Sequence, residues 1–474
     1  MFDHQVEAVE FAIKRQKCIL AHEMGLGKSL MAIMAADKEG FRILVICPAS
    51  LKINWKREIE KALPDQPIEI VNSDDTVQNW SARWFIINYD ILEKKMPMIT
   101  HLIQSRFDTL ILDEAHYIKG KSIRSACVVG GKVKKSDGTY ITQKGIAPQM
   151  KNVYLLTGTP LLNRPIELFN LLKAIEHPLG QKRTEFARRY CGAFLKQIMR
   201  RDGRMIRYVD ETGATNLNEL REAIRFQLLR RKKDEVLDLP RKMVSVMECD
   251  MDREYQRQYD TAWDSYLDFL QANPFPERNM DNILMARHLV EIQKLKQVCS
   301  LAKVKRMARD IENAIEQDEK VIVFSQYRNT ISEFQEELME KGIRCVTLTG
   351  DDDSESRQRA VDRFQDDPAT KVFVANIKAG GVGLNLTEAS IVMFADMDWS
   401  PEIHNQAIDR AHRIGQTRMV NAYFYVCPGT IEDDIMEILN SKKGVLDKVM
   451  EGKQETIRTD SVQAEFLRRM AGRA

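Results

Sequence analysis

The sequence predicts an α/β fold made of two parallel-sheet units with a helical, basic insertion between them. Short runs of apolar and β-branched residues alternate with helical patterns in the first third of the chain, and a second such series starts near residue 321. Nearly continuous apolar strands between helices are typical of a parallel sheet that is covered on both faces. Between the two series, over residues 165–318, the strand signal almost disappears and the pattern is helical.

The positions of the strands follow from the apolar runs. In the first unit the expected strands are residues 18–20, 41–47, 84–88, 109–112 and 153–156. In the second unit they are residues 321–324, 344–348, 371–375, 391–395 and 420–426. A chain of 474 residues is long enough for two or three domains. We therefore expect a first lobe, the insertion, a second lobe and a helical tail, at residues 1–178, 179–300, 301–440 and 441–474.

The charge of the chain is balanced overall but uneven along it. Lys and Arg number 71 against 69 Asp and Glu, a net charge of +2, which excludes a polycationic coat protein and an acidic solvating tail. Residues 181–242 alone hold 17 Lys and Arg against 9 Asp and Glu, a net +8. Two basic stretches, around Asp137-Gly138 and Asp202-Gly203, carry the turn chemistry of a β-hairpin. We expect both hairpins to protrude.

The eight cysteines are scattered, with no C-x-x-C pair, so the sequence shows neither a zinc site nor a disulfide framework. Such thiols usually behave as small buried residues in a reducing compartment. The N-terminus lacks the pattern of a signal peptide, and no run of 18 apolar residues occurs. We expect a soluble intracellular protein without a membrane segment.

The first chemical signal is the loop A-H-E-M-G-L-G-K-S at residues 21–29, between an apolar strand and a helix expected through residues 30–36. Gly25 and Gly27 let backbone N–H groups approach phosphates, Lys28 supplies a charge to the β and γ oxygens, and the Ser29 hydroxyl can ligate Mg²⁺. Met24 and Leu26 complete the loop that we expect to hold the nucleotide. The full phosphate-loop pattern would place Gly where this chain has His22, so the loop taken alone leaves chance glycines as an alternative.

The second signal is the acidic pair Asp113-Glu114, which directly follows the apolar run T-L-I-L. The carboxyl end of a strand is where an α/β sheet places its ligands. We expect Asp113 to hold Mg²⁺ and Glu114 to orient and deprotonate the water that attacks the γ-phosphate. The alternative is an ordinary helix cap or surface ion pair, which the upstream glycine loop disfavours.

The third signal is the segment Q-A-I-D-R-A-H-R-I-G-Q at residues 406–416. Arg410 and Arg413 are three residues apart, so on a helix they would share a face and could reach a polyanion. Together with Gln406 they are our candidates for the cations and polar groups that complete the catalytic site. Paired arginines on a helix are more often solvated, and these gain weight only beside the other two signals.

These segments together resemble the superfamily 2 helicase-type motors, and specifically the Swi/Snf family of double-stranded-DNA translocases. The loop, the D-E-A-H tetrad and the arginine segment are similar to motifs I, II and VI of that family. Four further segments resemble motifs Ia, III, IV and V of that family; they are residues 46–51, 156–163, 323–327 and 379–387, in that order. The segment L-L-R-R-K-K-D-E-V-L-D-L-P at 228–240 and the ending R-I-G-Q resemble this family more than motors in general, and residues 186–191 and 215–220 resemble its fork-remodelling, strand-annealing branch.

The resemblance implies two RecA-like lobes of the P-loop NTPase type and roles for further residues. Gln5 would read the adenine edge, and Thr157 and Thr159 would sense the nucleotide and couple it to the DNA strand. Residues in or near the motif loops would bind DNA phosphates; they are Ser50, Thr157, Ser325, Gln326, Thr349 and Lys378. From its charge alone, we also expect the hairpin with Arg200, Arg201, Arg204 and Arg207 to touch DNA.

The resulting hypothesis is an ATP- and Mg²⁺-dependent translocase, a monomer acting on double-stranded or forked DNA, which remodels or reanneals DNA or displaces bound proteins. The alternatives are a strand-separating DNA or RNA helicase, and a DNA-binding scaffold that has lost its ATPase. The expected location is a bacterial cytoplasm or the host cytoplasm of a virus, with the nucleus left open.

Overall fold

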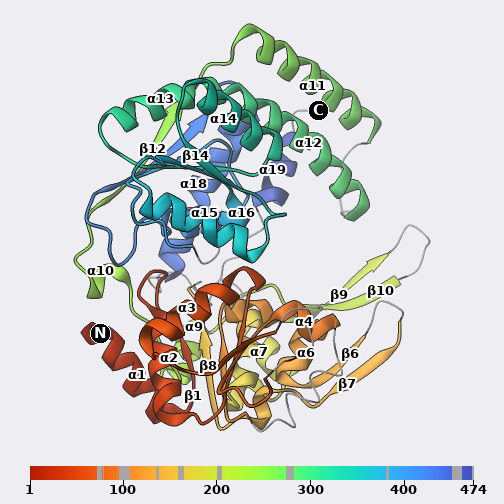
Figure 1. The fold of residues 1–474 in the computed structure, drawn as a ribbon. Coiled ribbons are helices and arrows are strands. Elements are labelled where there is room, and N and C mark those ends of the chain that lie inside the picture. The colour runs from red at the N-terminus through yellow and green to blue at the C-terminus, as the bar shows by residue number, and fades with distance from the viewer. Residues whose placement is uncertain are drawn as a thin grey trace. The chain divides into compact units, whose positions relative to one another are not determined.

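The computed structural model describes residues 1–71, 77, 79–94, 107–134, 138–158, 165–199, 205–273, 282–380, 384–450 and 462–471. Within these residues the chain forms two compact units, unit 1 chiefly from Met1–Asp238 and unit 2 chiefly from Leu239–Asp447 (Figure 1). The finer division into two lobes, an insertion and a tail stays a prediction.

Unit 1 is built on a seven-stranded sheet whose strands are all parallel, in the order β11-β1-β8-β5-β2-β4-β3. The five inner strands are almost entirely buried because they are runs of Ile, Leu, Val and Phe. The strands are β1 (Lys17–Leu20), β2 (Ile43–Cys47), β3 (Ile68–Ile70), β4 (Trp84–Asn88), β5 (Thr109–Leu112), β8 (Asn152–Leu156) and β11 (Leu228–Leu229).

Several helices of unit 1, among them α1, α2, α3 and α4, pack against this sheet. In α2, for example, Met31, Ala32 and Ile33 are buried together with Ala35 and Ala36, and the small alanines let the helix approach the sheet closely. The helices are α1 (Asp3–Arg15), α2 (Lys28–Glu39), α3 (Lys52–Ala62), α4 (Tyr89–Lys94), α6 (Ile123–Val129), α7 (Pro165–Ala174), α8 (Arg183–Tyr190), α9 (Leu217–Ile224) and α10 (Lys233–Val236).

Two antiparallel hairpins project from unit 1 (Figure 1). One pairs β6 (Gly131–Lys134) with β7 (Tyr140–Gln143), and the other pairs β9 (Phe194–Met199) with β10 (Met205–Asp210). Both hairpins predicted from the Asp-Gly turns are therefore confirmed.

Unit 2 is built on a six-stranded sheet, again entirely parallel, in the order β12-β17-β16-β13-β15-β14. Its strands are β12 (Lys242–Glu248), β13 (Val321–Ser325), β14 (Cys345–Leu348), β15 (Val372–Asn376), β16 (Ile391–Phe394) and β17 (Val420–Val426). Its helices are α11 (Arg253–Ala272), α12 (Asn282–Ala302), α13 (Val304–Glu316), α14 (Arg328–Glu340), α15 (Ser354–Asp366), α16 (Ile377–Gly380), α17 (Pro401–Ile408), α18 (Ile431–Met450) and α19 (Val462–Ala471).

The α/β fold class with two parallel sheets is confirmed, and the predicted strands lie within two residues of the observed ones. The expectation of a nearly strand-free segment at 165–318 is wrong in part, because β11 and β12 each add an edge strand to one of the sheets. β11 has only two residues, and β12 alternates exposed and half-buried side chains, so neither has the continuous apolar run of an inner strand.

The thiols and the helices also bear on the earlier expectations. Seven of the eight cysteines are buried and Cys345 is half-buried, as expected for cysteines that act as small apolar residues. Among the described residues, no helix is both long and apolar enough to cross a membrane.

Candidate functional site

The glycine loop of unit 1 connects β1 to α2 and depends on two residues in the left-handed region. Gly25 has φ +83° and Gly27 has φ +81°, a conformation that side chains disfavour. A Cβ at position 27 would also lie only 2.5 Å from Gln5 Nε2. Position 27 is therefore restricted to glycine by its backbone, and a side chain there would also have to displace the Gln5 amide.

Lys28 is the first residue of α2, and its ammonium group turns back into the loop. Nζ donates hydrogen bonds to the carbonyl oxygens of His22 (2.8 Å) and Glu23 (3.1 Å). The lysine of a phosphate-binding loop reaches the β and γ phosphates, and Nζ here lies within the loop. Ser29, half-buried, follows at the N-terminal end of the helix, where backbone N–H groups favour an anion.

Gln5 supports the loop from α1. Its side chain is almost fully buried; Nε2 donates to the Leu26 carbonyl (3.2 Å), and Oε1 accepts from the Phe2 backbone N–H (3.0 Å). His4 Nε2 lies 3.2 Å from the same Leu26 oxygen. Sequence reasoning did not foresee these bonds, which give Gln5 a role in shaping the loop. Its contact with adenine stays a prediction.

The acidic pair lies directly after β5. Asp113 Oδ2 accepts from Trp55 Nε1 (2.8 Å), Oδ1 accepts from the Glu114 backbone N–H (2.9 Å), and the Asp113 carbonyl accepts from the Tyr89 hydroxyl (2.7 Å). Burial, and then the adjacent Glu114 carboxylate, raise the pKa of Asp113 to about 6. The site thus holds a buried carboxylate that its protein partners stabilise only in part.

Glu114 itself has φ +48° and ψ +54°, a left-handed conformation that costs energy for a residue with a side chain. Its Oε2 lies 3.2 Å from His116 Nδ1. The strained turn directs two successive carboxylates to one end of the sheet, and such strain is often kept where it serves function.

These residues fit Mg²⁺. A divalent cation favours carboxylate and hydroxyl oxygens, and Asp113 is a buried carboxylate next to a second carboxylate, with the Trp55 indole and the Glu114 N–H as its hydrogen-bond donors. Asp113 and Ser29 are the residues that would hold it.

The loop after β8 adjoins the glycine loop. Thr157 is fully buried, and its backbone N–H donates to the Leu20 carbonyl (3.2 Å). A Cβ at Gly158 would lie 2.6 Å from Met24 Cγ and 3.5 Å from Lys28 Nζ. Unit 1 therefore brings Lys28, Met24 and the Thr157-Gly158 loop together. Thr159 lies outside the described residues.

The arginine segment of unit 2 is not helical. The helix α17, which carries the half-buried Gln406, ends at Ile408, and turns follow. The Arg410 carbonyl accepts from the Leu386 N–H (3.0 Å), and His412 Nε2 lies 2.8 Å from the Pro240 carbonyl oxygen. The prediction that the two arginines share one helix face is wrong, because α17 ends before Arg410 and the Arg410 carbonyl is bonded to the distant Leu386 N–H and not to a later residue of a continuing helix.

Both arginines are nevertheless held in defined positions. Arg410 is buried, and Arg413 Nη1 donates to the Leu384 carbonyl (3.3 Å). Gln416, the last residue of the I-G-Q ending, is buried and its Nε2 donates to the carbonyls of Thr387, Ala389 and Ala411 (3.0, 2.8 and 3.2 Å). Gln416 thus ties the arginine turns to residues 384–389, a role that the sequence pattern did not reveal.

Comparison with protein families identifies two matches in chain order. Residues 4–304 match the SNF2-related domain, and residues 301–415 match the helicase conserved C-terminal domain. The first match alone covers more than half of the chain. The chain belongs to the SNF2-related family. The family resemblance stated from the sequence motifs is confirmed.

Individual relatives of this SNF2-related chain include eukaryotic and bacterial proteins. It is 30% identical over 97% of its length to the DNA annealing helicase and endonuclease ZRANB3 of Homo sapiens, covering 41% of that protein. It is 31% identical over 95% of its length to a SWI/SNF-related matrix-associated actin-dependent regulator of chromatin subfamily A-like protein 1 homolog of Caenorhabditis elegans, covering 62%. An uncharacterized ATP-dependent helicase of Mycoplasma pneumoniae is 28% identical over 91% of the chain. The chain thus spans about 40–60% of the length of these relatives.

Among solved structures, the Sulfolobus solfataricus SWI2/SNF2 ATPase core in complex with dsDNA aligns with a TM-score of 0.41 and 23% identity, covering 96% of this chain and 93% of that one. The same core domain without DNA gives a TM-score of 0.40 and 24% identity, covering 94% and 89%.

Two residues predicted to contact DNA, Ser325 and Gln326, belong to a buried network in unit 2 of this SNF2-related chain. Asp396, almost fully buried after β16, accepts from Ser325 Oγ (2.6 Å), Ser300 Oγ (2.9 Å), the Gln326 backbone N–H (3.0 Å) and Gln326 Nε2 (3.0 Å). Gln326 Nε2 also donates to the Met397 carbonyl (2.7 Å). These bonds give both side chains a structural role, and their contact with DNA stays a prediction.

The other predicted DNA contacts lie in different places. Ser50 is half-buried in the turn Ala49–Leu51 of unit 1. In unit 2, Thr349 Oγ1 donates to Asp352 (3.0 Å), and the exposed Lys378 Nζ lies 3.7 Å from Asp398. Arg207 is exposed on β10. The hairpin residues Arg200, Arg201 and Arg204 lie outside the described residues.

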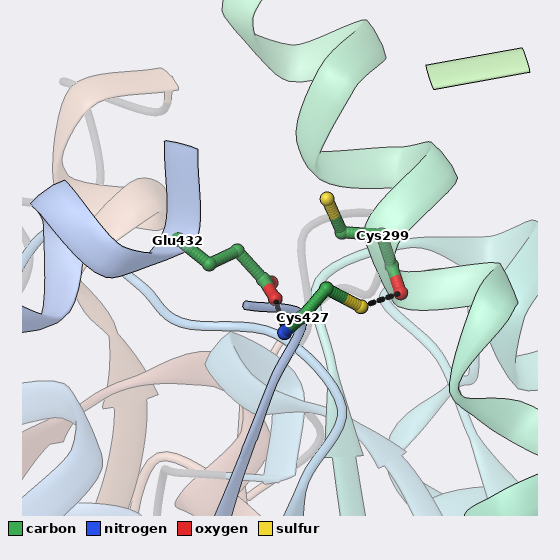
Figure 2. Close-up of side chains that lie close together, drawn as sticks. All are labelled: Cys299, Cys427 and Glu432. Atoms are coloured by element: carbon green, nitrogen blue, oxygen red, sulfur yellow. Dashed lines mark hydrogen bonds between the residues drawn. The ribbon is translucent and has the colours of Figure 1, made fainter. Parts of the chain in front are cut away.

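One group of potential metal ligands in the described part of the chain is Cys299, Cys427 and Glu432, all buried (Figure 2). Its chemistry does not favour a metal. Both oxygens of Glu432 accept from Lys303 Nζ (2.7 and 2.8 Å), and one also accepts from the Cys427 backbone N–H. Burial raises the pKa of the Cys299 thiol, which disfavours the thiolate that a metal requires. We interpret the cluster as a buried ion pair with two neighbouring thiols.

Proposed function

We propose that this chain is an ATP-dependent translocase on double-stranded DNA, which remodels or reanneals forks and junctions or displaces bound proteins. The observation that carries the proposal is the arrangement at one end of the unit 1 sheet. There a glycine loop, a lysine and a strained acidic pair follow the carboxyl ends of parallel strands, in a member of the SNF2-related family.

In the proposed mechanism the loop binds the triphosphate. Lys28 exchanges its two loop carbonyls for phosphate oxygens, and the N–H groups at the start of α2 hold the same anion. Because Gly27 leaves room for Gln5, α1 braces the loop in this shape. The loop is therefore set before the nucleotide arrives, and little of the binding energy is lost on ordering it.

Asp113 and Glu114 have separate roles, one in metal binding and the other in activating water. Mg²⁺, held by Asp113 and Ser29, would neutralise charge on the β and γ phosphates. Glu114 orients and deprotonates the attacking water. The indole of Trp55 fixes the orientation of the Asp113 carboxylate by a hydrogen bond.

Unit 2 would contribute Arg410 and Arg413, together with Gln406, to the charge that develops during hydrolysis. A guanidinium supplied in this way acts as an arginine finger. The turns that present the arginines are fixed by Gln416 and by the Leu386 N–H, so their positions are set by the fold of unit 2.

The DNA contacts are part of the proposal. Hydroxyl, amide and cationic groups would bind the phosphate backbone, so we expect slight sequence preference and strong dependence on salt. The proposed residues are Ser50, Thr157, Ser325, Gln326, Thr349, Lys378 and Arg207. We further propose that the chain acts as a monomer inside the cell.

The central experiment compares the rate of ATP hydrolysis with linear duplex, forked duplex, single-stranded DNA and RNA. We expect the duplexes to stimulate hydrolysis most. Stimulation by single strands or RNA alone would instead favour the strand-separating helicase, and no stimulation by any nucleic acid would favour the scaffold.

A variant separates binding from turnover. Arg410→Ala/Arg413→Ala is expected to abolish DNA-stimulated hydrolysis while a fluorescent ATP analogue still binds, because the nucleotide loop lies in unit 1. Arg306→Ala, which removes an exposed arginine of α13, is the matched control and should hydrolyse ATP normally. Full turnover in the double variant would reject the assignment of these arginines.

A further inference from the structure

The hairpin β9–β10 carries several apolar side chains that are exposed to solvent. The exposed fraction of the residue is 45% for Phe194, 56% for Leu195, 55% for Met205, 39% for Tyr208 and 53% for Val209. Such a two-stranded ribbon is only marginally stable in water by itself. Exposed apolar groups gathered on one projecting element indicate a surface that is covered during function.

The register of the strands places these side chains on both faces of the ribbon. Leu195 lies opposite Val209, and Gln197 opposite Arg207, on one face. On the other face Lys196 lies opposite Tyr208, and Phe194 is the diagonal neighbour of Tyr208. Among the side chains that the structure describes, the first face therefore carries exposed aliphatic groups and the second carries exposed aromatic ones, with Asp210 directly opposite Phe194.

Charge favours a nucleic acid over a protein as the ligand. Arg207 is exposed on one face, and Lys196 is exposed on the other, where its Nζ lies 3.6 Å from Asp210 Oδ2. The surrounding sequence, residues 181–242, has 17 Lys and Arg against 9 Asp and Glu. A partner that contacts both cations and apolar groups needs phosphates beside flat apolar surfaces, and unpaired or terminal bases provide this combination.

The two-sided exposure favours a particular part of the DNA. A continuous duplex hides its base faces in the stack and offers only phosphates and groove edges. At a branch point, by contrast, two duplex arms end next to each other and each presents a terminal base face. A thin ribbon with apolar groups on both faces matches such a pair of ends.

We propose that the β9–β10 hairpin is a two-sided wedge for branched DNA, with Phe194 and Tyr208 stacking on the end of one arm and Leu195 and Val209 packing on the other. This inference rests on the proposed function, since it names the DNA structure on which the translocase acts. It extends the charge-based expectation for this hairpin from phosphate contact to recognition of the branch.

The test uses the full chain and two DNAs of equal length and composition, a linear duplex and a three-armed fork. Two variants each remove one face, Phe194→Thr/Tyr208→Thr and Leu195→Thr/Val209→Thr. Threonine favours a strand and all four side chains are exposed, so the ribbon should persist. Phe41→Thr is the matched control, because Phe41 is 80% exposed and precedes the amino end of β2, away from the nucleotide loop.

Binding is measured by fluorescence anisotropy, and ATP hydrolysis is measured with the same DNAs. We expect each double variant to raise the dissociation constant for the fork about tenfold, the range for loss of a base-stacking aromatic, and that for the linear duplex less than twofold. Basal hydrolysis without DNA and the control should not change.

Three outcomes would overturn the wedge. Equal weakening on both DNAs would make the hairpin a general contact to the backbone. An effect from only one face would make it a one-sided platform. No change on either DNA would leave its apolar groups to a protein partner. If no DNA stimulates hydrolysis by the unmodified chain, the translocase proposal fails, while anisotropy still decides whether the hairpin recognises the branch.

Discussion

Asp113 in unit 1 and Asp396 in unit 2 occupy similar places in two parallel sheets, yet they differ in the hydrogen bonds that their carboxylates accept. Each follows an inner strand and is largely buried. Asp396 accepts hydrogen bonds from two hydroxyls, an amide side chain and a backbone N–H. Asp113 accepts from one indole and one backbone N–H, beside a second carboxylate. A buried charge that its protein satisfies holds structure together, whereas one left partly unsatisfied is suited to a ligand.

Unit 2 contains a second buried charge with full hydrogen bonding, the Lys303–Glu432 ion pair, and it gives the largest expected effect. Glu432→Leu would leave a buried ammonium with only the Tyr425 carbonyl, and we expect a loss of about 3–5 kcal/mol in the free energy of unfolding. The double variant Lys303→Met/Glu432→Leu should lose much less, because no charge remains buried. Urea unfolding measures both. Equal losses would show that the packing, and not the charge, is what matters.

The variant Asp113→Asn tests the other half of the comparison, the buried carboxylate that has fewer hydrogen-bond donors. We expect ATP turnover to fall about 10²–10³-fold, the cost of removing one group that stabilises the transition-state charge. The urea midpoint should change little, because the amide removes a buried charge whose pKa is raised to about 6 but sets an N–H group against one of its two donors, Trp55 Nε1 or the Glu114 N–H. Asp90→Asn, a half-exposed partner of Arg124 in the same unit, serves as the control. A marked loss of stability without loss of turnover would contradict the comparison.

The reverse result is expected for Asp396→Asn. The Asn Oδ1 atom can accept from some of the four donors, but the NH₂ group would face the remaining donors and leave them unpaired. We therefore expect a loss of about 1.5–3 kcal/mol in the free energy of unfolding. Asp318→Asn, which changes a highly exposed carboxylate paired with Lys371, should cause no measurable change. If Asp396→Asn keeps full stability, the network is not what holds the ends of β13 and β16 together.

The smallest effect concerns pH and His404. Its Nε2 accepts from the Asp398 backbone N–H (2.9 Å) between Phe394 and Phe424, and burial, followed by Lys296, lowers the pKa of the imidazole to about 3. The unfolded chain takes up this proton near pH 6.5. Stability from this group is therefore complete above pH 6.5 and declines as the pH falls toward 3. His404→Gln should flatten the dependence of the urea midpoint between pH 7.5 and 5; an unchanged slope would exclude this histidine as its source.

The sequence predicted most strands because inner parallel strands are continuous apolar runs, whose signal survives without tertiary information. It did not predict β12, an edge strand whose side chains alternate, nor the end of α17 at Ile408. No helix-breaking residue stands between Ile408 and Arg413. Beyond the helix, the Arg410 carbonyl accepts from the Leu386 N–H and the His412 side chain contacts the Pro240 carbonyl, so the conformation there involves residues distant in the chain.

The candidate site shows the same limit. The glycine loop and the acidic pair could be found because their chemistry is written in adjacent residues. The bonds of Gln5 to Leu26, of Trp55 to Asp113 and of Gln416 to three carbonyls join residues whose separation in sequence carries no pattern. The chemical groups were therefore predictable, but the residues that hold them in place were not.

The burial of the thiols has a practical consequence. Seven cysteines are buried and burial raises the pKa of Cys345, the remaining one, so maleimide dyes should react slowly with the natural chain. One new cysteine on each unit would then carry a donor and an acceptor fluorophore with little background. Energy transfer between the dyes could follow, in single molecules, how nucleotide and DNA change the separation of the two halves.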